Sequence, residues 1–469
     1  MAKGPGGIIS GGFQPLKAPD APTIDSVSAG VLSADVTFSA PADTGAGSVD
    51  SYVITAKQSD GSGVSETASA AGTVSLTLTA GGTTTFAAQA ISNAFGPGQF
   101  SGFGNSTSVF SGQELYGFGS NNYGELGIAT TTDRSSPTQV GALTNWSSFS
   151  AGFNHSVASK TDGTLWSWGN DIAGGLGIDT SYRTNQSSPV QVGALTNWSQ
   201  VSAGKSFSVA IKTDGTLWSW GNGAYGQLGN NSTANRSSPI QVGSETNWSQ
   251  VFAGSYHTAA VTTSGELYVW GNGGSGEIGN NAAVSTSSPV QVGALTNWSQ
   301  VTCGGNTAAI KTDGTLWSWG NNGDGRVGDN TTISRSSPVQ VGALTNWSQV
   351  TCGNQHTVAI KTSGTLWAWG NNFFGMLGIN SRQQKSSPTQ VGSLSTWSFV
   401  SAGRHTSAIK TDGTLWGWGH NGYGGFGAGR IGDNTAIDRS SPVQVGASTN
   451  WSSVSAGDSF SLAAIGSTS

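Results

Sequence analysis

Four histidines recur at one position of a repeated sequence, and they are the residues of this chain best suited to bind a metal ion. They share the G-x-x-H position of the repeat and are His155, His257, His356 and His405. A structural zinc site needs about four ligands that meet at one ion. These histidines belong to separate repeats, and other repeats hold Phe or Asn instead, at Phe207, Asn306 and Phe460. We therefore expect them to pack and hydrogen bond at local turns, and we expect no metal site.

Other reactive residue types also fall at repeated positions. Cys303 and Cys352 stand where other repeats have alanine, so we expect small buried residues without a disulfide. The N-W-S tripeptides match a glycosylation acceptor, but they recur as the start of a strand. The sequence has no nucleophile elbow, phosphate-binding loop or carboxylate pair, so it predicts neither catalytic residues nor a cofactor. A turn role is expected for the aspartates of the T-D-G sequences, which are Asp162, Asp214, Asp313 and Asp412.

The unit that positions these residues is about fifty residues long and occurs seven times. Its L-[WY]-x-[WF]-G core begins with a leucine, and successive leucines are 50, 52, 50, 49, 50 and 49 residues apart. Such a period is typical of an array of supersecondary units that bury their apolar faces against one another. The seven leucines are Leu115, Leu165, Leu217, Leu267, Leu316, Leu366 and Leu415.

Four short runs in each unit have the composition of β-strands. In one unit they span residues 307–311, 315–320, 337–341 and 347–353. The T-D-G sequence between the first two predicts a tight hairpin. Alternation puts Trp317 and Trp319 on one strand face and Leu316 and Ser318 on the other. All 18 tryptophans of the chain occupy three repeat positions, so we expect aromatic wedges between neighbouring sheets.

Seven four-stranded units predict an all-β fold, a seven-bladed β-propeller. The array starts in mid-unit with ELYGFG at 114–119 and ends with FSLAAI at 460–465. The second run matches the strand that precedes TLWSWG elsewhere. We therefore expect the C-terminal strand to pair with the N-terminal one and close the ring.

The repeat resembles a known family. GFNHSVASKTDGTLWSWGNDIAGGLG from Gly152 and GNQHTVAIKTSGTLWAWGNNFFGMLG from Gly353 are similar to the regulator of chromosome condensation repeat. The resemblance implies a seven-bladed propeller, and the family's best-known member binds chromatin and promotes nucleotide exchange on a small GTPase. From Glu114 onward, however, the chain has 16 Lys and Arg against 17 Asp and Glu. We therefore expect no nucleic-acid partner.

Four segments divide the chain. Residues 1–17 form a Gly/Pro-rich tail, which is either a disordered leader or an anchor, with Ile8, Ile9, Phe13 and Leu16 as candidate anchor residues. Residues 18–109 have short alternating strands around SYVITAK, VSLTLTA and TTTFAAQAIS, typical of a β-sandwich. With P-D-A-P-T and Tyr52, this segment resembles a fibronectin type III module, an immunoglobulin-like sandwich, although Phe38 and Phe86 replace its usual Trp and Tyr. Residues 110–113 are a linker, and 114–469 form the propeller.

The two predicted rims of the propeller differ in sequence. One repeats K-T-D-G and G-A-L-T-N nearly unchanged, while the loops between G-x-L-G and S-S-P vary in length and content. Variable loops on a rigid scaffold are where binding usually occurs. The longest of them, at 428–439, gives the candidate binding residues Tyr423, Phe426, Arg430, Asp433, Asn434 and Arg439.

Charged residues make up only 9% of the chain, so its surface consists largely of neutral polar groups. No signal peptide and no apolar run long enough to span a membrane are present, so we expect no membrane insertion. The first hypothesis is a non-enzymatic bacteriophage virion surface protein, whose tail binds other virion proteins and whose variable rim contacts a host-surface protein or glycan. The alternatives are a cellular protein-protein interaction scaffold in the cytoplasm and a secreted, extracellular bacterial adhesin.

Overall fold

The computed structural model describes residues 18–30, 33–44, 48–58, 63–77, 82–92, 96–100, 104–109, 113–179, 184–422 and 429–466. The candidate anchor residues Ile8, Ile9, Phe13 and Leu16, and the rim residues Tyr423 and Phe426, lie outside these ranges. The chain divides into two compact units, Met1–Ser111 with Ser467–Ser469, and Gly112–Gly466. No helix in the described part of the chain is long and apolar enough to cross a membrane.

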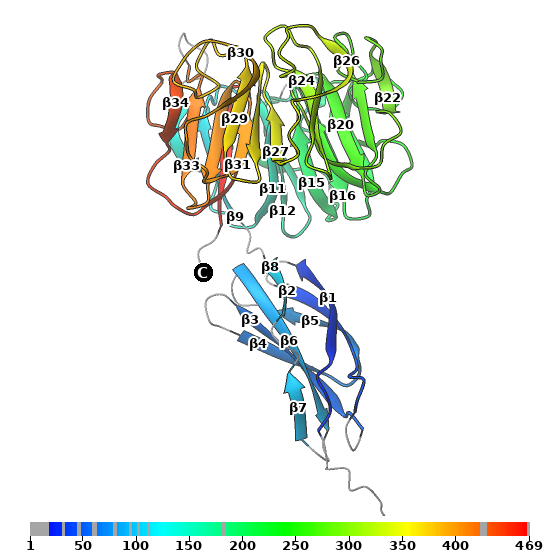
Figure 1. Cartoon of the computed structure of the whole chain (residues 1–469). Coiled ribbons are helices and arrows are strands. Elements are labelled where there is room, and N and C mark those ends of the chain that lie inside the picture. The colour runs from blue at the N-terminus through cyan, green and yellow to red at the C-terminus, as the bar shows by residue number, and fades with distance from the viewer. Residues whose placement is uncertain are drawn as a thin grey trace, which may run out of the picture. The chain divides into compact units, whose positions relative to one another are not determined.

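The N-terminal unit contains two antiparallel sheets (Figure 1). The first has the order β1-β2-β5, with β1 at Thr23–Gly30, β2 at Ser33–Ser39 and β5 at Gly72–Thr77. The second has the order β4-β3-β6-β7, and β8 also pairs with β6. Its strands are β3 (Ser51–Gln58), β4 (Gly63–Ala68), β6 (Gly82–Ser92), β7 (Gly96–Phe100) and β8 (Gly104–Val109). The three runs expected from the sequence form β3, β5 and β6.

One apolar core joins the two sheets of this unit. Val36 and Phe38 of the first sheet and Tyr52, Ile54 and Phe86 of the second are buried in the same cluster. The rings of Phe38 and Tyr52 lie 5.1 Å apart between centroids, at an interplanar angle of 56°. Every second side chain of β3 is buried, as expected for strands with one face toward a core.

The second unit is a ring of four-stranded blades (Figure 1). Five sheets contain four consecutive strands each, and an eight-stranded sheet contains two further blades that a single residue pair joins, Trp146 with Gln113. The described residues thus form seven blades, which confirms the predicted propeller. Each blade begins with a strand that opens on tryptophan, continues through two hairpins, and ends with the strand around S-S-P. The fourth predicted run of each unit therefore starts the next blade.

Blade 1 contains the first strand of the propeller, β9, and blades 2 to 7 follow in chain order from β11. Blade 2 contains β11 (Trp146–Ala151), β12 (His155–Lys160), β13 (Leu165–Gly169), a 3-10 turn η1 (Ile172–Gly174) and β14 (Gln186–Gln191). Blade 3 contains β15 (Trp198–Ala203), β16 (Phe207–Lys212), β17 (Leu217–Gly221) and β18 (Arg236–Gln241). Blade 4 contains β19 (Trp248–Ala253), β20 (His257–Thr262), β21 (Leu267–Gly271) and β22 (Thr286–Gln291).

The remaining complete blades repeat this order. Blade 5 contains β23 (Trp298–Cys303), β24 (Asn306–Lys311), β25 (Leu316–Gly320) and β26 (Arg335–Gln340). Blade 6 contains β27 (Trp347–Cys352), β28 (His356–Lys361), β29 (Leu366–Gly370) and β30 (Lys385–Gln390). Blade 7 contains β31 (Trp397–Ala402), β32 (His405–Lys410), β33 (Leu415–Gly419) and β34 (Arg439–Gln444).

Blade 1 closes the ring with strands from both ends of the unit. It contains β35 (Trp451–Ala456), β36 (Phe460–Gly466), β9 (Gln113–Gly119) and β10 (Arg134–Gln139). Strand β36 pairs antiparallel with β9 without a break, from Phe460 opposite Gly119 to Gly466 opposite Gln113. This confirms the predicted closure, and Gln113, which was expected to end the linker, is the first residue of β9.

Tryptophan side chains fill the spaces between blades. Trp319 of blade 5 has no exposed surface and lies in one apolar cluster with Val261 and Leu267 of blade 4. Its Nε1 donates a hydrogen bond of 2.9 Å to the carbonyl oxygen of Glu277, also in blade 4. Leu316, on the opposite strand face, packs in a cluster with Trp347 of blade 6. The wedge interpretation and the predicted alternation are therefore both confirmed.

Candidate functional site

The two ends of the propeller carry different sets of turns. Backbone hydrogen bonds such as Trp198 N to Gly163 O, at 3.0 Å, bring the T-D-G turns and the T-N-W segments to one end. At the other end, Arg326 of a variable loop donates from Nη1 to the carbonyl oxygen of Asn354 in a G-x-x-H turn, at 2.8 Å. We call the first end the conserved rim, because its turns repeat nearly unchanged from blade to blade, and the second end the variable rim. The division follows the one predicted from the sequence.

On the conserved rim, the aspartates hold a fixed hydrogen-bond chain. Asp313 Oδ1 accepts bonds from the backbone N and the Oγ1 of Thr315, at 2.9 and 2.6 Å. Trp317 Nε1 donates in turn to Thr315 Oγ1 at 2.9 Å. The bonds from the Thr315 side chain and backbone hold the pKa of Asp313 below its usual value. The same chain occurs at Asp162, Asp214 and Asp412, as expected for turn residues.

The four repeated histidines lie beneath the variable rim and link neighbouring blades. His155 Nε2 lies 2.9 Å from Ser208 Oγ of the next blade, and His356 Nε2 lies 2.8 Å from Thr406 Oγ1. His257 and His405 make the corresponding contacts with Thr307 and Ser461. The bonds therefore cross a blade boundary, whereas the sequence analysis placed them within a local turn. The sequence could not show this, because the partner hydroxyl lies about one repeat away.

Burial keeps these imidazoles neutral. It lowers the pKa of His155 and of His257 to about 4, and burial together with the nearby Arg326 lowers the pKa of His356 to about 3. Within the described residues, no group of three or more His, Cys, Asp or Glu side chains could hold a metal ion. The two cysteines are free and buried, and burial raises the pKa of Cys352 to about 12.

Four of the six predicted rim residues are described, and their polar groups make bonds within the propeller. Arg430 is only 2% exposed, and its Nη1 lies 2.9 Å from His420 Nδ1. Asp433 accepts a bond of 2.7 Å from Arg439 Nε. Asn434 has a positive φ of 61°, and its backbone N donates to Ser135 O at 2.8 Å. These four residues shape the loop and connect blade 7 to blade 1.

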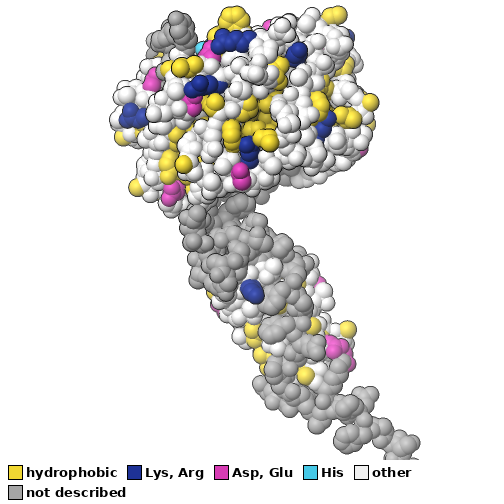
Figure 2. Space-filling model, turned by 60° about the vertical axis from the view of Figure 1, so that its left-hand side comes forward, with side chains coloured by type: hydrophobic (Ala, Val, Ile, Leu, Met, Phe, Trp, Pro, Cys, Tyr) yellow, Lys and Arg dark blue, Asp and Glu magenta, His cyan; other side chains and the backbone are white. Residues whose placement is uncertain are grey.

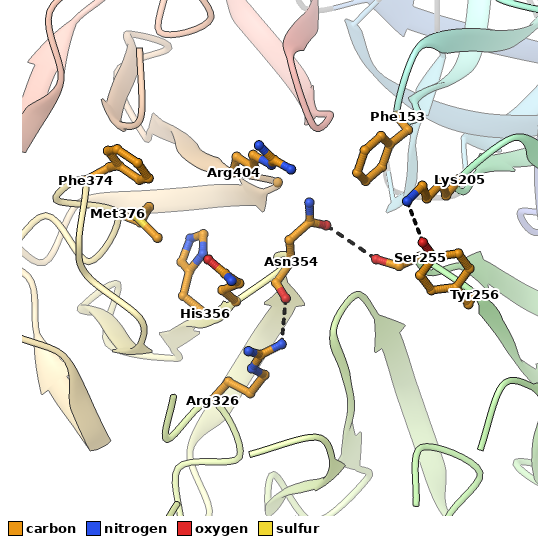
Figure 3. A pocket seen from close by; sticks show the side chains of 12 residues that line it. Phe153, Lys205, Ser255, Tyr256, Arg326, Asn354, His356, Phe374, Met376 and Arg404 are labelled. Atoms are coloured by element: carbon orange, nitrogen blue, oxygen red, sulfur yellow. Dashed lines mark hydrogen bonds between the residues drawn. The ribbon is translucent and has the colours of Figure 1, made fainter. Parts of the chain in front are cut away.

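A pocket of about 330 Å³ lies instead at the centre of the variable rim (Figure 3). The G-x-x-H turns of several blades supply Phe153, Lys205, Ser255, Tyr256, Asn354, Gln355 and Arg404 to its lining. The loops that follow the third strand of blades 5 and 6 supply Arg326, Phe374 and Met376. A narrower cavity of about 70 Å³ shares several of these turn residues and is lined by the alanines and cysteines that end the first strands. The pocket is therefore the mouth of the central channel, and we call it the channel mouth.

Cationic and aromatic side chains alternate around the channel mouth. Lys205 Nζ lies 2.5 Å from Tyr256 Oη and 4.7 Å from the ring centroids of both Phe153 and Tyr256. Arg404 Nε lies 2.8 Å from Asp458 Oδ1, and Asn354 donates to the same carboxylate. Burial raises the pKa of Asp458 even though Arg404 and Arg430 act against the shift. Figure 3 shows Arg404, Asn354, Phe153 and Lys205 around one opening.

The channel mouth presents cationic, amide and aromatic side chains. The lining contains no nucleophile hydrogen bonded to a general base. His356 Nδ1 and Arg326 Nε are buried side-chain atoms without a hydrogen-bond partner among the described residues. On the propeller face in Figure 2, charged side chains of both signs are scattered over neutral polar surface. The channel mouth gathers cations that the sequence spreads over several repeats.

Sequence reasoning missed these residues, although the sequence contained a signal. The two positions between Gly and His differ in nearly every repeat, reading FN after Gly152, KS after Gly204, SY after Gly254 and NQ after Gly353. Two of the turns, after Gly304 and Gly403, are one residue shorter. Variation at these short turns was less visible than in the longer loops, yet the turns surround the channel.

A closed ring of seven blades with one conserved and one variable rim defines a repeat propeller whose variable turns surround the channel mouth. An RCC1-like domain model matches residues 236–467, and two models of the regulator of chromosome condensation (RCC1) repeat match 113–159 with 162–211, and 146–174 with 198–227. The propeller of this chain belongs to the regulator of chromosome condensation repeat family.

Similarity to known proteins in sequence and in structure is consistent with this assignment. The regulator of chromosome condensation of Xenopus laevis is 34% identical over 119 residues, which are 24% of this chain and 28% of that protein. The ultraviolet-B receptor UVR8 of Arabidopsis thaliana is 34% identical over 132 residues, which are 27% of this chain and 30% of that protein. The matched regions thus span less than a third of either relative. Yeast RCC1 (Prp20), solved bound to Kap60, has the same fold, with a TM-score of 0.68 and 20% identity over 76% of this chain and 90% of its own.

Proposed function

We propose that this chain is a non-enzymatic scaffold that binds a protein partner at its variable rim, with the channel mouth as the centre of the interface. The observation that carries this proposal is the convergence of side chains from several blades on one pocket. Phe153, Lys205, Tyr256 and Arg404 come from four different blades, and each lies in the turn between the first and second strands of its blade. A ring of repeats needs no such side chains to close, so their chemistry is available for a partner.

The chemistry of the pocket favours a partner segment that combines an aromatic or aliphatic group with a carboxylate. The Arg404 side chain is 51% exposed although it pairs with Asp458, so one side of the guanidinium can still receive a carboxylate. Phe153, Tyr256 and Phe374 offer aromatic surface, which often supplies much of the energy of an interface. Yeast RCC1 (Prp20), which has the same fold, was solved bound to the protein Kap60, and this supports a protein partner for the present chain.

For the N-terminal unit, we propose a fibronectin type III-like sandwich that mounts the propeller. Two antiparallel sheets around one core, with Phe38 against Tyr52, support this assignment. The predicted anchor residues Ile8, Ile9, Phe13 and Leu16 precede the first strand of this unit in the sequence.

A virion surface protein that attaches to a host protein or glycan is a second candidate, and a secreted adhesin is a third. The observation that favours them is the 9% charge content, which makes the exposed surface mainly neutral and polar. Deleting residues 1–17 tests the virion proposal. A virion protein with this anchor should fold normally after the deletion and be lost from purified particles. Unchanged incorporation would contradict the anchor.

Affinity capture with the full chain tests the scaffold proposal. Proteins retained by the wild type should be lost with Lys205→Ala/Arg404→Ala, because that variant removes two cations of the channel mouth without touching the blade interiors. The matched control is Leu344→Ala, at a 47% exposed position on the conserved rim, which should retain them. Equal capture by the wild type and both variants would rule out the channel mouth as the binding surface.

A further inference from the structure

The groove between blades 3 and 4 differs chemically from the equivalent groove between blades 4 and 5. The first has a volume of about 490 Å³ and is lined by Glu245, Trp248, Thr262, Glu266 and Tyr268, beside Gln241 at the end of β18 and Ser288 of β22. The second has a volume of about 410 Å³, and its corresponding lining includes Leu295, Trp298, Lys311 and Trp317. Since the backbone repeats, the differences come from the side chains.

In five blades, a lysine covers a pair of aromatic rings at this place. Lys311 Nζ lies 3.9 Å from the ring centroid of Trp317 and 4.9 Å from that of Trp298. In the other four such blades the shorter distance is 3.5 to 3.7 Å. A cation this close to a ring face is attracted by the ring quadrupole. The five lysines are Lys160, Lys212, Lys311, Lys361 and Lys410.

Blade 4 keeps the two rings but has no lysine. The Trp248 and Tyr268 rings are 5.3 Å apart at 77°, close to the geometry of the other pairs. Thr262 replaces the lysine, and its short side chain bonds to Ser264 Oγ at 2.9 Å. Blade 1 also lacks the lysine, but there Ile465 packs against Tyr116 in the same apolar cluster. Among the described residues that line the groove of blade 4, none is a lysine or arginine.

Two carboxylates stand beside these rings instead. Glu245 replaces Leu295 of the neighbouring groove, and Glu266 replaces Thr315. Burial raises the pKa of Tyr268, and the charges of Glu266 and Glu245 add to the shift, as expected for carboxylates close to the ring.

Both carboxylates keep free acceptor capacity. Glu245 Oε2 accepts a bond from Ser244 N at 3.1 Å. Glu266 Oε2 accepts from Ser264 Oγ at 3.2 Å and from Thr262 Oγ1 at 3.3 Å. An ionised carboxylate has about four acceptor sites, so each can bond to a further donor.

We propose that this groove binds a primary alkylammonium group, the chemistry of a lysine side chain, supplied from outside the chain. The ammonium takes the place above Tyr268 that Lys311 Nζ takes above Trp317, and it donates to Glu245 and Glu266. Its methylene chain lies along Trp248 and Tyr268, as an amphipathic side chain covers apolar surface. This site is separate from the channel mouth and does not depend on the function proposed for that pocket.

The experiment is a titration of the full chain with Nα-acetyl-lysine methylamide, followed by ligand-observed NMR. We expect saturable binding with a Kd of about 1 mM. The Nε-acetylated compound, which has no charge, should bind at least tenfold more weakly. Thr262→Lys should also weaken binding at least tenfold, because the new lysine occupies the site, and five blades already fold with lysine there. Absence of saturable binding to the wild type, or equal binding to Thr262→Lys, would overturn the proposal.

Two further variants separate the site from general charge attraction. Glu245→Leu/Glu266→Thr introduces the residues of the neighbouring groove and should weaken binding at least tenfold. Glu66→Gln removes one negative charge from an exposed position of the N-terminal unit and should leave the Kd unchanged. If both variants weakened binding equally, the ligand would be attracted by net charge alone, which would contradict a specific site in the groove.

Discussion

The conserved rim and the variable rim are built from the same repeats, yet their side chains follow different rules. On the conserved rim, four blades repeat one hydrogen-bond chain from Asp through Thr to Trp, with nearly identical distances. On the variable rim, the turns keep their backbone bonds, such as Gly152 N to His155 O and Gly353 N to His356 O, but change the side chains between those residues. A turn whose side chains support its own blade cannot vary without loss of stability, whereas a turn held by backbone bonds can.

Ring closure supports both rims, so its loss should have the largest effect. Deletion of residues 459–469 removes β36, which pairs with both β35 and β9. Strand β9 and strand β35 would then present unpaired edges, which promote aggregation. We expect loss of solubility or a large fall in Tm, measured by circular dichroism. A truncated protein as stable as the full chain would contradict the closed ring.

Removal of a tryptophan wedge should come next. Trp319→Ala deletes a fully buried ring that contacts blades 4 and 5, and we expect the free energy of unfolding to fall by about 3–5 kcal/mol. Chemical denaturation measures this change. Val284→Ala on the variable rim, at a 63% exposed side chain, is the control and should change stability by less than about 0.5 kcal/mol.

The histidines beneath the variable rim should make stability depend on pH. The folded pKa of His155 is about 4, against an ordinary value of 6.5, so the unfolded state takes up a proton first as the pH falls. Stability is therefore complete above about pH 6.5 and decreases toward pH 4, by up to about 3 kcal/mol for this residue. His155→Phe, the residue found at Phe207, should remove this part of the pH dependence. Chemical unfolding at several pH values measures how the free energy of unfolding changes with pH. If His155→Phe shows the same pH dependence as the wild type, His155 is not its cause.

Loss of one hydroxyl on the conserved rim should have the smallest effect of these variants. Thr315→Val keeps the shape of the side chain but removes the hydroxyl that joins Asp313 to Trp317. We expect a loss of about 1–2 kcal/mol, because the hydroxyl takes part in two hydrogen bonds and each usually contributes about 1 kcal/mol. Ser255→Ala on the variable rim is the matched comparison, since its hydroxyl makes only a long contact of 3.5 Å with Asn354 Oδ1. An equal fall in the free energy of unfolding for the two variants would contradict the proposed difference between the rims.

Much of the fold could be predicted because its determinants are local and repeated. The spacing of Leu316, Trp317 and Trp319, the T-D-G turn and the mismatch between the two ends of the array predicted the strands, the wedges and the closure. The candidate site was harder to predict. Arg430 belongs to the longest loop, but it is buried against His420, and no local pattern distinguishes it from an exposed arginine.

The sequence by itself determined the blade, because strand alternation and turn chemistry act within a few residues of one another. The tertiary structure alone decided which side chains meet. Lys205 and Tyr256 are 51 residues apart, and the packing of blade 3 against blade 4 brings Lys205 Nζ to 2.5 Å from Tyr256 Oη. The groove beside Tyr268 has the same origin, since Asn230 and Gln241 of blade 3 line it together with Thr262 of blade 4. Contacts between blades are set by the geometry of the ring, which no single repeat contains.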